Sequence, residues 1–109
     1  MLAREPLRRH HVCVIQTWAD QLTADLFEGA DNARTRKVAQ DLAERAVKKL
    51  LLIDAATKLE DLRLPRANNL EKLAGDRKGQ HSIRVNGQWR ICFRWDNGHA
   101  YDVEFVDYH

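Results

Sequence analysis

The sequence predicts a single α+β domain in which a twisted antiparallel β-sheet is packed on one face by two to three helices. The chain has 109 residues, 44% of them hydrophobic, which is enough for one core and too little for two ordinary domains. Helical periodicity dominates the first half of the chain, whereas apolar and polar residues alternate in the second half. Helices followed by a run of strands are typical of the α+β class.

The first half of the chain predicts one strand and two helices. Residues 12–18, VCVIQTW, are rich in β-branched and apolar residues and predict a short strand, central or near-central in the sheet. A short helix should follow, with Asp20 as its N-cap and Gly29 as its end. Residues 31–62 predict a long amphipathic helix that ends before Pro65, since apolar residues recur there at spacings of three and four.

The second half predicts an antiparallel meander. Residues 65–79 are polar, basic and glycine-containing, which indicates an extended loop with a short strand near 70–73. Three strands should follow at 81–85, 88–95 and 100–106, joined by the turn signals NG and DNG. Their alternation assigns these side chains to the core face: Ile83, Val85, Trp89, Ile91, Phe93, Trp95, Tyr101, Val103 and Phe105.

The register of the meander is only partly predictable. A two-residue NG turn would mix the two faces, so we expect an additional residue or bulge, which places Arg84 opposite Arg90. Two registers of the second hairpin keep the faces apart. One pairs Arg90 with Glu104. The other pairs Arg94 with Asp102, and the sequence does not choose between them.

Charge is distributed unevenly, although the net charge is only +2. Residues 63–95 contain eight basic and two acidic side chains, whereas residues 96–109 contain four acidic side chains and no Lys or Arg. Like charges at Arg84 and Arg90 are unfavourable unless an anion lies near them. These features favour a polyanion partner with chemistry at the charge boundary, although a solvated face laced with ion pairs would use the same residues.

Composition also predicts the cellular compartment of the protein, the state of its cysteines and the absence of a metal or other cofactor. No apolar run is long enough to cross a bilayer, and residues 1–11 lack the apolar centre of a secretory signal, so we expect a cytoplasmic protein with no membrane partner. Cys13 and Cys92 then predict two reduced thiols. Adjacent His10 and His11 do not form a metal-ligand pattern, and neither a metal nor another cofactor is expected.

Four segments carry a resemblance to a known family: LFEG, GDRKG, SIRVNGQWRI and the terminal YDVEFVDYH. Together they resemble HigB-type toxins of the RelE superfamily, over residues 14–109 as a single domain, with residues 1–13 as an N-terminal extension. The resemblance implies a RelE-like fold with an open, basic polar face. It further implies a ribosome-dependent, metal-independent endoribonuclease that cuts mRNA in the ribosomal A site, and a HigA-like helix-turn-helix antitoxin as partner.

Metal-free RNA cleavage needs a base for the 2′-OH, a cation for the charged transition state and an acid for the departing 5′-oxygen. Arg90 is the candidate cation, with Arg84 assisting. His109 is the candidate acid or base, because the reference pKa of histidine is near 6.5. Tyr108 could stack on or orient a nucleotide base, and Asp107 could hold His109 or accept a proton.

Glu71 is a further candidate base, with plain surface charge as the alternative. The resemblance also marks two departures, because many relatives carry a histidine where this chain has Glu71 and a lysine where it has Ala74. Phosphate contacts are therefore expected from the remaining cations, with a solvated surface as the alternative: Lys72, Arg77, Lys78, Arg84 and Arg94.

Two other functions compete with the ribonuclease. One is a non-catalytic inhibitor that binds RNA or the ribosome, and the other is a gyrase-targeting toxin on the same fold, against which the terminal DYH argues. The basic side of the long helix and the N-terminal extension are the surfaces we expect an antitoxin to contact.

Overall fold

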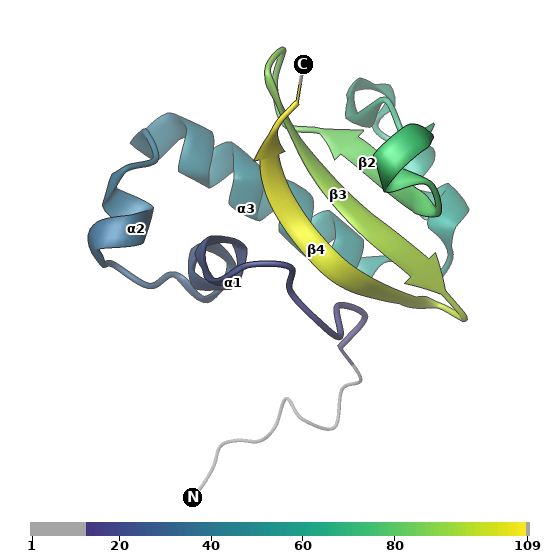
Figure 1. Cartoon of the computed structure of the whole chain (residues 1–109), viewed down its shortest axis with the longest axis horizontal. Helices are drawn as coiled ribbons and strands as arrows, with labels where there is room; N and C mark the ends of the chain where they lie inside the picture. Colours follow the sequence, from purple (N-terminus) through teal and green to yellow (C-terminus); the bar gives the residue numbers. More distant parts are fainter. Residues whose placement is uncertain (1–12, 109) are drawn as a thin grey trace, which may run out of the picture.

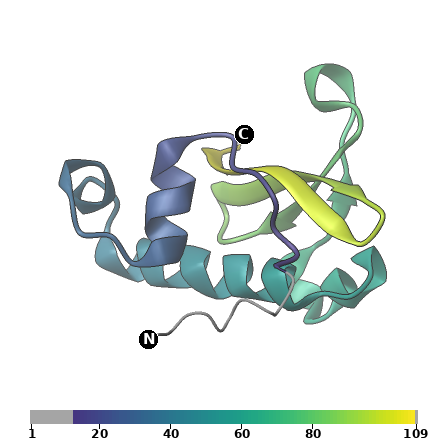
Figure 2. The same cartoon turned by 90° about the horizontal axis from the view of Figure 1, so that it is seen from below.

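The computed structural model describes residues 13–108 and forms one α+β unit (Figure 1). Four antiparallel strands form a sheet of order β1-β2-β3-β4: β1 (Glu71–Lys72), β2 (Gln80–Arg84), β3 (Trp89–Asp96) and β4 (His99–Asp107). Figure 2 shows α3 (Gln40–Ala55) running beneath one face of this sheet. The predicted α+β class, the short strand near 70–73 and the meander are confirmed.

Helix α1 (Gln21–Glu28) begins and ends where the sequence predicts. The carboxylate of Asp20 accepts hydrogen bonds from the backbone nitrogen of Thr23 at 2.9 Å and from its hydroxyl at 2.6 Å. Gly29 ends the helix with φ of 74°, a left-handed conformation in which a Cβ would be strained. Both predicted helix boundaries are therefore confirmed.

The predicted long helix is interrupted. Helix α2 (Ala33–Arg36) stops after one turn, Ala39 is extended, and the chain resumes as α3 before a 3-10 turn at Leu59–Arg63. Asn32 and Thr35 form a reciprocal capping box at the start of α2. The prediction of one continuous helix over 31–62 was wrong, because neither glycine nor proline marks the break in the periodic pattern.

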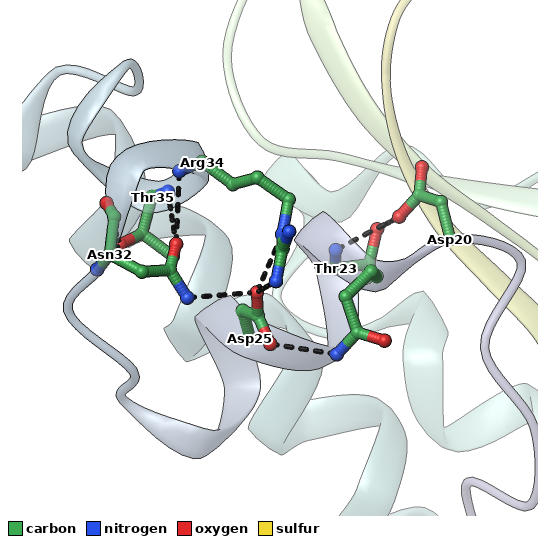
Figure 3. Close-up of polar contacts among 7 residues, drawn as sticks. Asp20, Thr23, Asp25, Asn32, Arg34 and Thr35 are labelled. Carbon is green, nitrogen blue, oxygen red and sulfur yellow. Dashed lines mark hydrogen bonds and ion pairs between the residues drawn. The ribbon is translucent and has the colours of Figure 1, made fainter.

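A buried carboxylate fixes α2 against α1 (Figure 3). Asp25 of α1 is only 6% exposed and accepts hydrogen bonds from Gln21 at 2.8 Å, from Asn32 at 3.1 Å and from the Nε of Arg34 at 2.9 Å. The hydrogen bonds from Gln21 and Asn32, followed by that of Arg34 and its positive charge, lower the pKa of Asp25 below its ordinary value. Asn32 thus both caps α2 and binds α1, which holds the corner between the two helices.

The core lies between α3 and the sheet. Ala46, Leu50 and Ile53 of α3 are fully buried. They belong to the same cluster as seven side chains from the sheet side: Ile83, Val85, Ile91, Phe93, Ala100, Val103 and Phe105. Tyr101 was expected here but is replaced by Ala100, because Asp102 adopts φ of 54° at a bulge and shifts the alternation by one residue.

The predicted first strand is not central. Residues 13–19 run beside β4 at the edge of the sheet, in parallel, with isolated bridges at Ile15–Ala100 and Trp18–Val103 (Figure 1). Backbone hydrogen bonds such as the one from Gln16 to the carbonyl of Ala100, 2.8 Å long, hold the segment there. A stretch rich in β-branched residues thus serves as an irregular fifth member of the sheet, and its expected central position was wrong.

Extra residues at the NG turn set the register of the β2–β3 hairpin, and a bulge shifts the register of the β3–β4 hairpin. Arg84 lies opposite Arg90, as predicted from the extra residues needed around the NG turn. In the second hairpin Arg90 pairs with Val106 and Cys92 with Glu104, which is the register implied by pairing Arg94 with Asp102. Beyond Cys92 a bulge shifts the pairing by one residue, so Arg94 lies opposite Tyr101, although its side chain still forms an ion pair with Asp102 at 3.2 Å.

Candidate functional site

The polar face of the sheet, which lies opposite α3, is less open than expected. Ser82 and Cys92 are fully buried there and Arg90 is only 8% exposed. The loop around the 3-10 turn Gly75–Arg77 lies over this face, in front of β2 and β3 in Figure 1. The Nη1 of Arg77 donates a hydrogen bond to Glu104 on β4 at 3.1 Å, so the loop is fastened across β3.

Arg90 is held by side chains and backbone from two other segments. Its Nε donates to the hydroxyl of Ser82 at 2.7 Å, and its Nη2 donates to the carbonyl of Asn69 at 2.7 Å. The Nη2 also lies 3.6 Å from a carboxylate oxygen of Glu71. Within residues 13–108, Nη1 makes no hydrogen bond, which leaves one donor side of the guanidinium for a ligand. The planar fork of Arg90 is therefore fixed in orientation.

The carbonyl that binds Arg90 is itself positioned from α3. Asn69 adopts φ of 46°, an unusual conformation for a residue with a side chain. Its neighbour Asn68 is fully buried, donates to the carbonyl of Leu62 at 3.1 Å and accepts a hydrogen bond from Lys49. No pattern in the sequence predicts a role for Asn69, and only the bent loop brings its carbonyl to Arg90.

The end of the chain lies over Arg90. The centroid of the Tyr108 ring is 5.9 Å from the guanidinium carbon of Arg90, within the range of a cation–π contact. The backbone nitrogen of Tyr108 donates to the carbonyl of Gln88 at 2.8 Å. Tyr108 thus lies on the same face of the sheet as Arg90. Asp107 accepts a hydrogen bond from Gln88 at 2.9 Å, and His109 lies outside the described residues.

Glu71 is the accessible carboxylate of the site. It pairs with Ser82 across β1 and β2, and its side chain is 48% exposed, against 10% for Arg90. A carboxylate at solvent, an oriented guanidinium and an aromatic ring therefore meet at one point of the polar face. We call this set the Arg90 cluster: Glu71, Ser82, Arg90 and Tyr108.

The remaining predicted cations lie on β1, β2, β3 and the loop between β1 and β2, and Arg84 is the cross-strand neighbour of Arg90. Arg77 is paired with Glu104 at 3.1 Å, and Arg94 with Asp102 at 3.2 Å across the bulge. The exposed Arg84 donates from Nε to the carbonyl of Asn86. Two further exposed cations are carried by β1 and the following loop: Lys72 and Lys78.

Two structural features bear on partners and cofactors. None of the described helices is long and apolar enough to cross a membrane. Within residues 13–108, His, Cys, Asp and Glu side chains form no group of three or more that could hold a metal ion.

A four-stranded antiparallel sheet with helices on one face, and an arginine beside the end of the last strand on the other, is the architecture expected of a RelE-like toxin. The sequence matches the model of the HigB-like toxin family, described as the RelE-like toxin of type II toxin-antitoxin system HigB, over residues 12–109. The chain belongs to this family.

Two relatives that carry the HigB name agree with this assignment. The chain is 39% identical over 79 residues to Toxin HigB-1 of Vibrio cholerae, a match that covers 72% of this chain and 82% of the relative. It is 42% identical over 71 residues to Endoribonuclease HigB of Proteus vulgaris, covering 65% and 75%. An uncharacterised protein of Haemophilus influenzae is 34% identical over 73 residues, covering 67% and 71%.

Proposed function

We propose that this toxin is a ribosome-dependent, metal-independent endoribonuclease that cleaves mRNA in the ribosomal A site and so inhibits translation. Family membership supports a toxin of a type II toxin-antitoxin system, and one relative is named an endoribonuclease. The Arg90 cluster carries the proposal, because it combines an oriented cation with an exposed carboxylate 3.6 Å away. These are two of the three groups that metal-free RNA cleavage requires.

In the proposed reaction Glu71 removes the proton of the 2′-OH, and the 2′-oxygen attacks the adjacent phosphorus. The fixed guanidinium of Arg90 binds the phosphate oxygens, on which negative charge grows in the transition state. The bond from phosphorus to the 5′-oxygen breaks, and His109 donates a proton to that oxygen. The products are a 2′,3′-cyclic phosphate and a 5′-hydroxyl, with no water consumed in this step.

Recognition of the message is assigned to the rest of the polar face. The ring of Tyr108 lies over the guanidinium of Arg90 and presents a surface on which a nucleotide base can stack. Asp107 is assigned to orient His109. We assign phosphate contacts to five further cations: Lys72, Arg77, Lys78, Arg84 and Arg94. Two of these cations are held in place by ion pairs, Arg77 with Glu104 and Arg94 with Asp102.

The partner and compartment follow from the same assignment. A type II toxin implies an antitoxin, and we propose a HigA-like protein with a helix-turn-helix DNA-binding fold. Because the substrate is a translated message, the site of action is the cytoplasm.

Primer-extension mapping on a message translated in extract tests the proposal. Wild type should yield discrete cut sites, whereas Arg90→Ala and deletion of His109 should abolish them. Arg36→Ala serves as the control, because Arg36 lies on α2 in an exposed pair with Asp31. Cleavage that persists in both site variants would contradict the assignment of the site, and an uncut message with wild type would contradict the activity.

The burial of Arg90 favours a second candidate. With its side chain 10% exposed and three protein partners, Arg90 could serve mainly to hold the sheet together. The toxin would then inhibit translation by binding RNA or the ribosome without cutting. Growth arrest by Arg90→Ala together with full-length message would support this alternative.

A further inference from the structure

An apolar groove is lined by α3, by Pro65 in the loop that follows it and by Val85 just after β2, and none of its lining residues belongs to the Arg90 cluster. Its volume is about 580 Å³. Its floor is aliphatic: Leu51, Leu52, Pro65 and Val85. Its other lining side chains all carry positive charge: Arg45, Lys48 and Lys49. We call this site the α3 groove.

The apolar surface of α3 is wider than the core requires. Leu50 and Ile53 are fully buried, whereas Leu51 between them is 52% exposed. Within residues 13–108 only one other large apolar side chain is so exposed, Leu64 at 69%, and it directly precedes Pro65 of the groove. Single exposed leucines are common, but Leu51 lines an apolar groove and Leu64 adjoins one of its lining residues, which indicates a surface that a partner covers.

The charge around the groove selects the partner. A smaller hollow shares Arg45 and Lys49 with the groove and adds Arg84, which extends the cationic border to the end of β2. Acidic residues are absent from the described lining of both hollows. An occupant with Asp or Glu side chains beside its apolar contacts would match this border, and such complementarity favours rapid and specific association.

We propose that the α3 groove is the docking site of the antitoxin, and that the antitoxin fills it with an amphipathic segment whose apolar side chains are flanked by carboxylates. This inference rests on the type II toxin-antitoxin assignment made above. The apolar face of the segment would cover Leu51 and Leu52, and its carboxylates would lie near Arg45 and Lys48. An amphipathic segment laid in such a groove is a common mode of protein recognition.

RNA fits the same surface poorly. Proteins that bind single-stranded RNA stack bases on aromatic rings, and no described side chain that lines the α3 groove is aromatic. A floor of leucine, proline and valine gains most from aliphatic contacts with protein. The cations would bind phosphate, but the exposed Leu51 would then remain unexplained.

Affinity measurements with groove variants test the inference. The probe is the co-encoded antitoxin, titrated into refolded toxin by calorimetry. Leu51→Glu and Lys48→Glu should each weaken binding by about tenfold or more, which corresponds to roughly 1.4 kcal/mol. Lys37→Glu is the matched control, since Lys37 is an exposed lysine of the same helical layer outside the groove, and it should change the affinity less than about twofold.

Message cleavage in translating extract separates this inference from the proposed function. Groove variants that bind antitoxin weakly and still cleave at wild-type rates would support the groove as the antitoxin site. Weakened binding with no cleavage by any protein, wild type included, would support the groove and contradict the ribonuclease alone. Unchanged antitoxin affinity in both groove variants would overturn the inference, and if these variants also lost cleavage, the groove would be assigned to the ribosome.

Discussion

The guanidinium carbon of Arg90 lies 5.9 Å from the ring centroid of Tyr108, so a buried cation of β3 and the end of the chain meet on the polar face. Arg90 is fixed from below by Ser82 and Asn69, at 2.7 Å each. Tyr108 is fixed through its backbone by Gln88 in the NG loop. Asp107 and Tyr108 are thus held beside the site by tertiary contacts.

Replacement of Arg90 by lysine tests whether the planar guanidinium group, rather than the positive charge alone, is required for cleavage. Lysine keeps the positive charge but cannot bond Ser82 and Asn69 while it also presents two donors to a phosphate. We expect Arg90→Lys to lower the rate of message cleavage by about 100-fold, the usual cost of removing one preorganised donor. Single-turnover cleavage in translating extract measures this, and a rate within a few-fold of wild type would show that charge alone suffices.

Ser82 is predicted to be a positioning residue for Arg90. Ser82→Ala leaves the buried Nε of Arg90 without its acceptor, which should cost about 1–3 kcal/mol in the free energy of unfolding. Cleavage should fall about tenfold while the affinity of the toxin for ribosomes stays unchanged, because the phosphate-binding fork is misaligned but still charged. A parallel loss of ribosome affinity would instead indicate general damage to the fold.

Glu71 is predicted to act as the general base. Because Glu71 also lies beside Arg90, the variant Glu71→Gln separates the role of a base from that of an ion-pair partner. If Glu71 serves only as an ion-pair partner, Glu71→Gln frees Arg90 and cleavage should be retained or rise. If Glu71 is the base, cleavage should fall by about 100-fold or more.

Histidine at the same position offers the matched rescue. Glu71→His should recover part of the activity, and the acidic limb of its pH–rate profile should lie near 6.5, because histidine titrates about two units above glutamate. Measurement of single-turnover rates between pH 5 and pH 8, with wild type beside the variant, gives both profiles. An acidic limb at the same pH in both would assign that limb to another group.

Patterns along the strands predicted much of the sheet, because each is a local property. The NG turn required extra residues to keep the faces apart, and this alone placed Arg84 opposite Arg90. Strand alternation could not predict the bulge at Asp102. A positive φ at an aspartate carries no sequence signal as strong as a glycine, and the shift moved Tyr101 out of the predicted core.

The site was predicted less completely than the sheet, for a geometric reason. Arg90 and Tyr108 lie on strand positions whose facing follows from alternation, so their common face could be predicted, whereas the 5.9 Å contact between them depends on a register that the sequence left open. The acceptors of Arg90 were not, since the carbonyl of Asn69 reaches it only through a loop anchored by the buried Asn68. Alternation placed Ser82 on the polar face as well, but it could not show that a loop buries this face.

The Arg77–Glu104 contact is predicted to close the polar face over Cys92. Burial raises the pKa of the Cys92 thiol, so in the intact protein it should react slowly with a disulfide reagent at pH 8. In a Cys13→Ser background, Arg77→Ala and Glu104→Gln should each speed labelling of Cys92 by about tenfold, because one ion pair closes the loop. Lys78→Ala, in the same loop, is the control, and equal rates in all proteins would show that other contacts close it.

The Asp25 corner predicts a component of the pH dependence of stability. Its carboxylate accepts hydrogen bonds from Gln21, Asn32 and Arg34, which lower its pKa in the folded chain. A depressed pKa means that the stabilisation is present in full above the ordinary pKa of aspartate, about 3.9, and is lost as the pH falls through the lower folded value. Asp25→Asn should therefore be less stable than wild type at pH 7.

Urea unfolding at pH 7, 5, 4 and 3 measures this effect. The difference in unfolding free energy between wild type and Asp25→Asn should shrink as the pH falls below about 4. Protonation of Asp25 in wild type removes the same negative charge that the substitution removes. Asp31→Asn is the matched control. Its carboxylate is also paired with an arginine, but its side chain is 78% exposed, so the loss should be much smaller. A constant difference at every pH would mean that Asp25 stabilises the corner by packing alone.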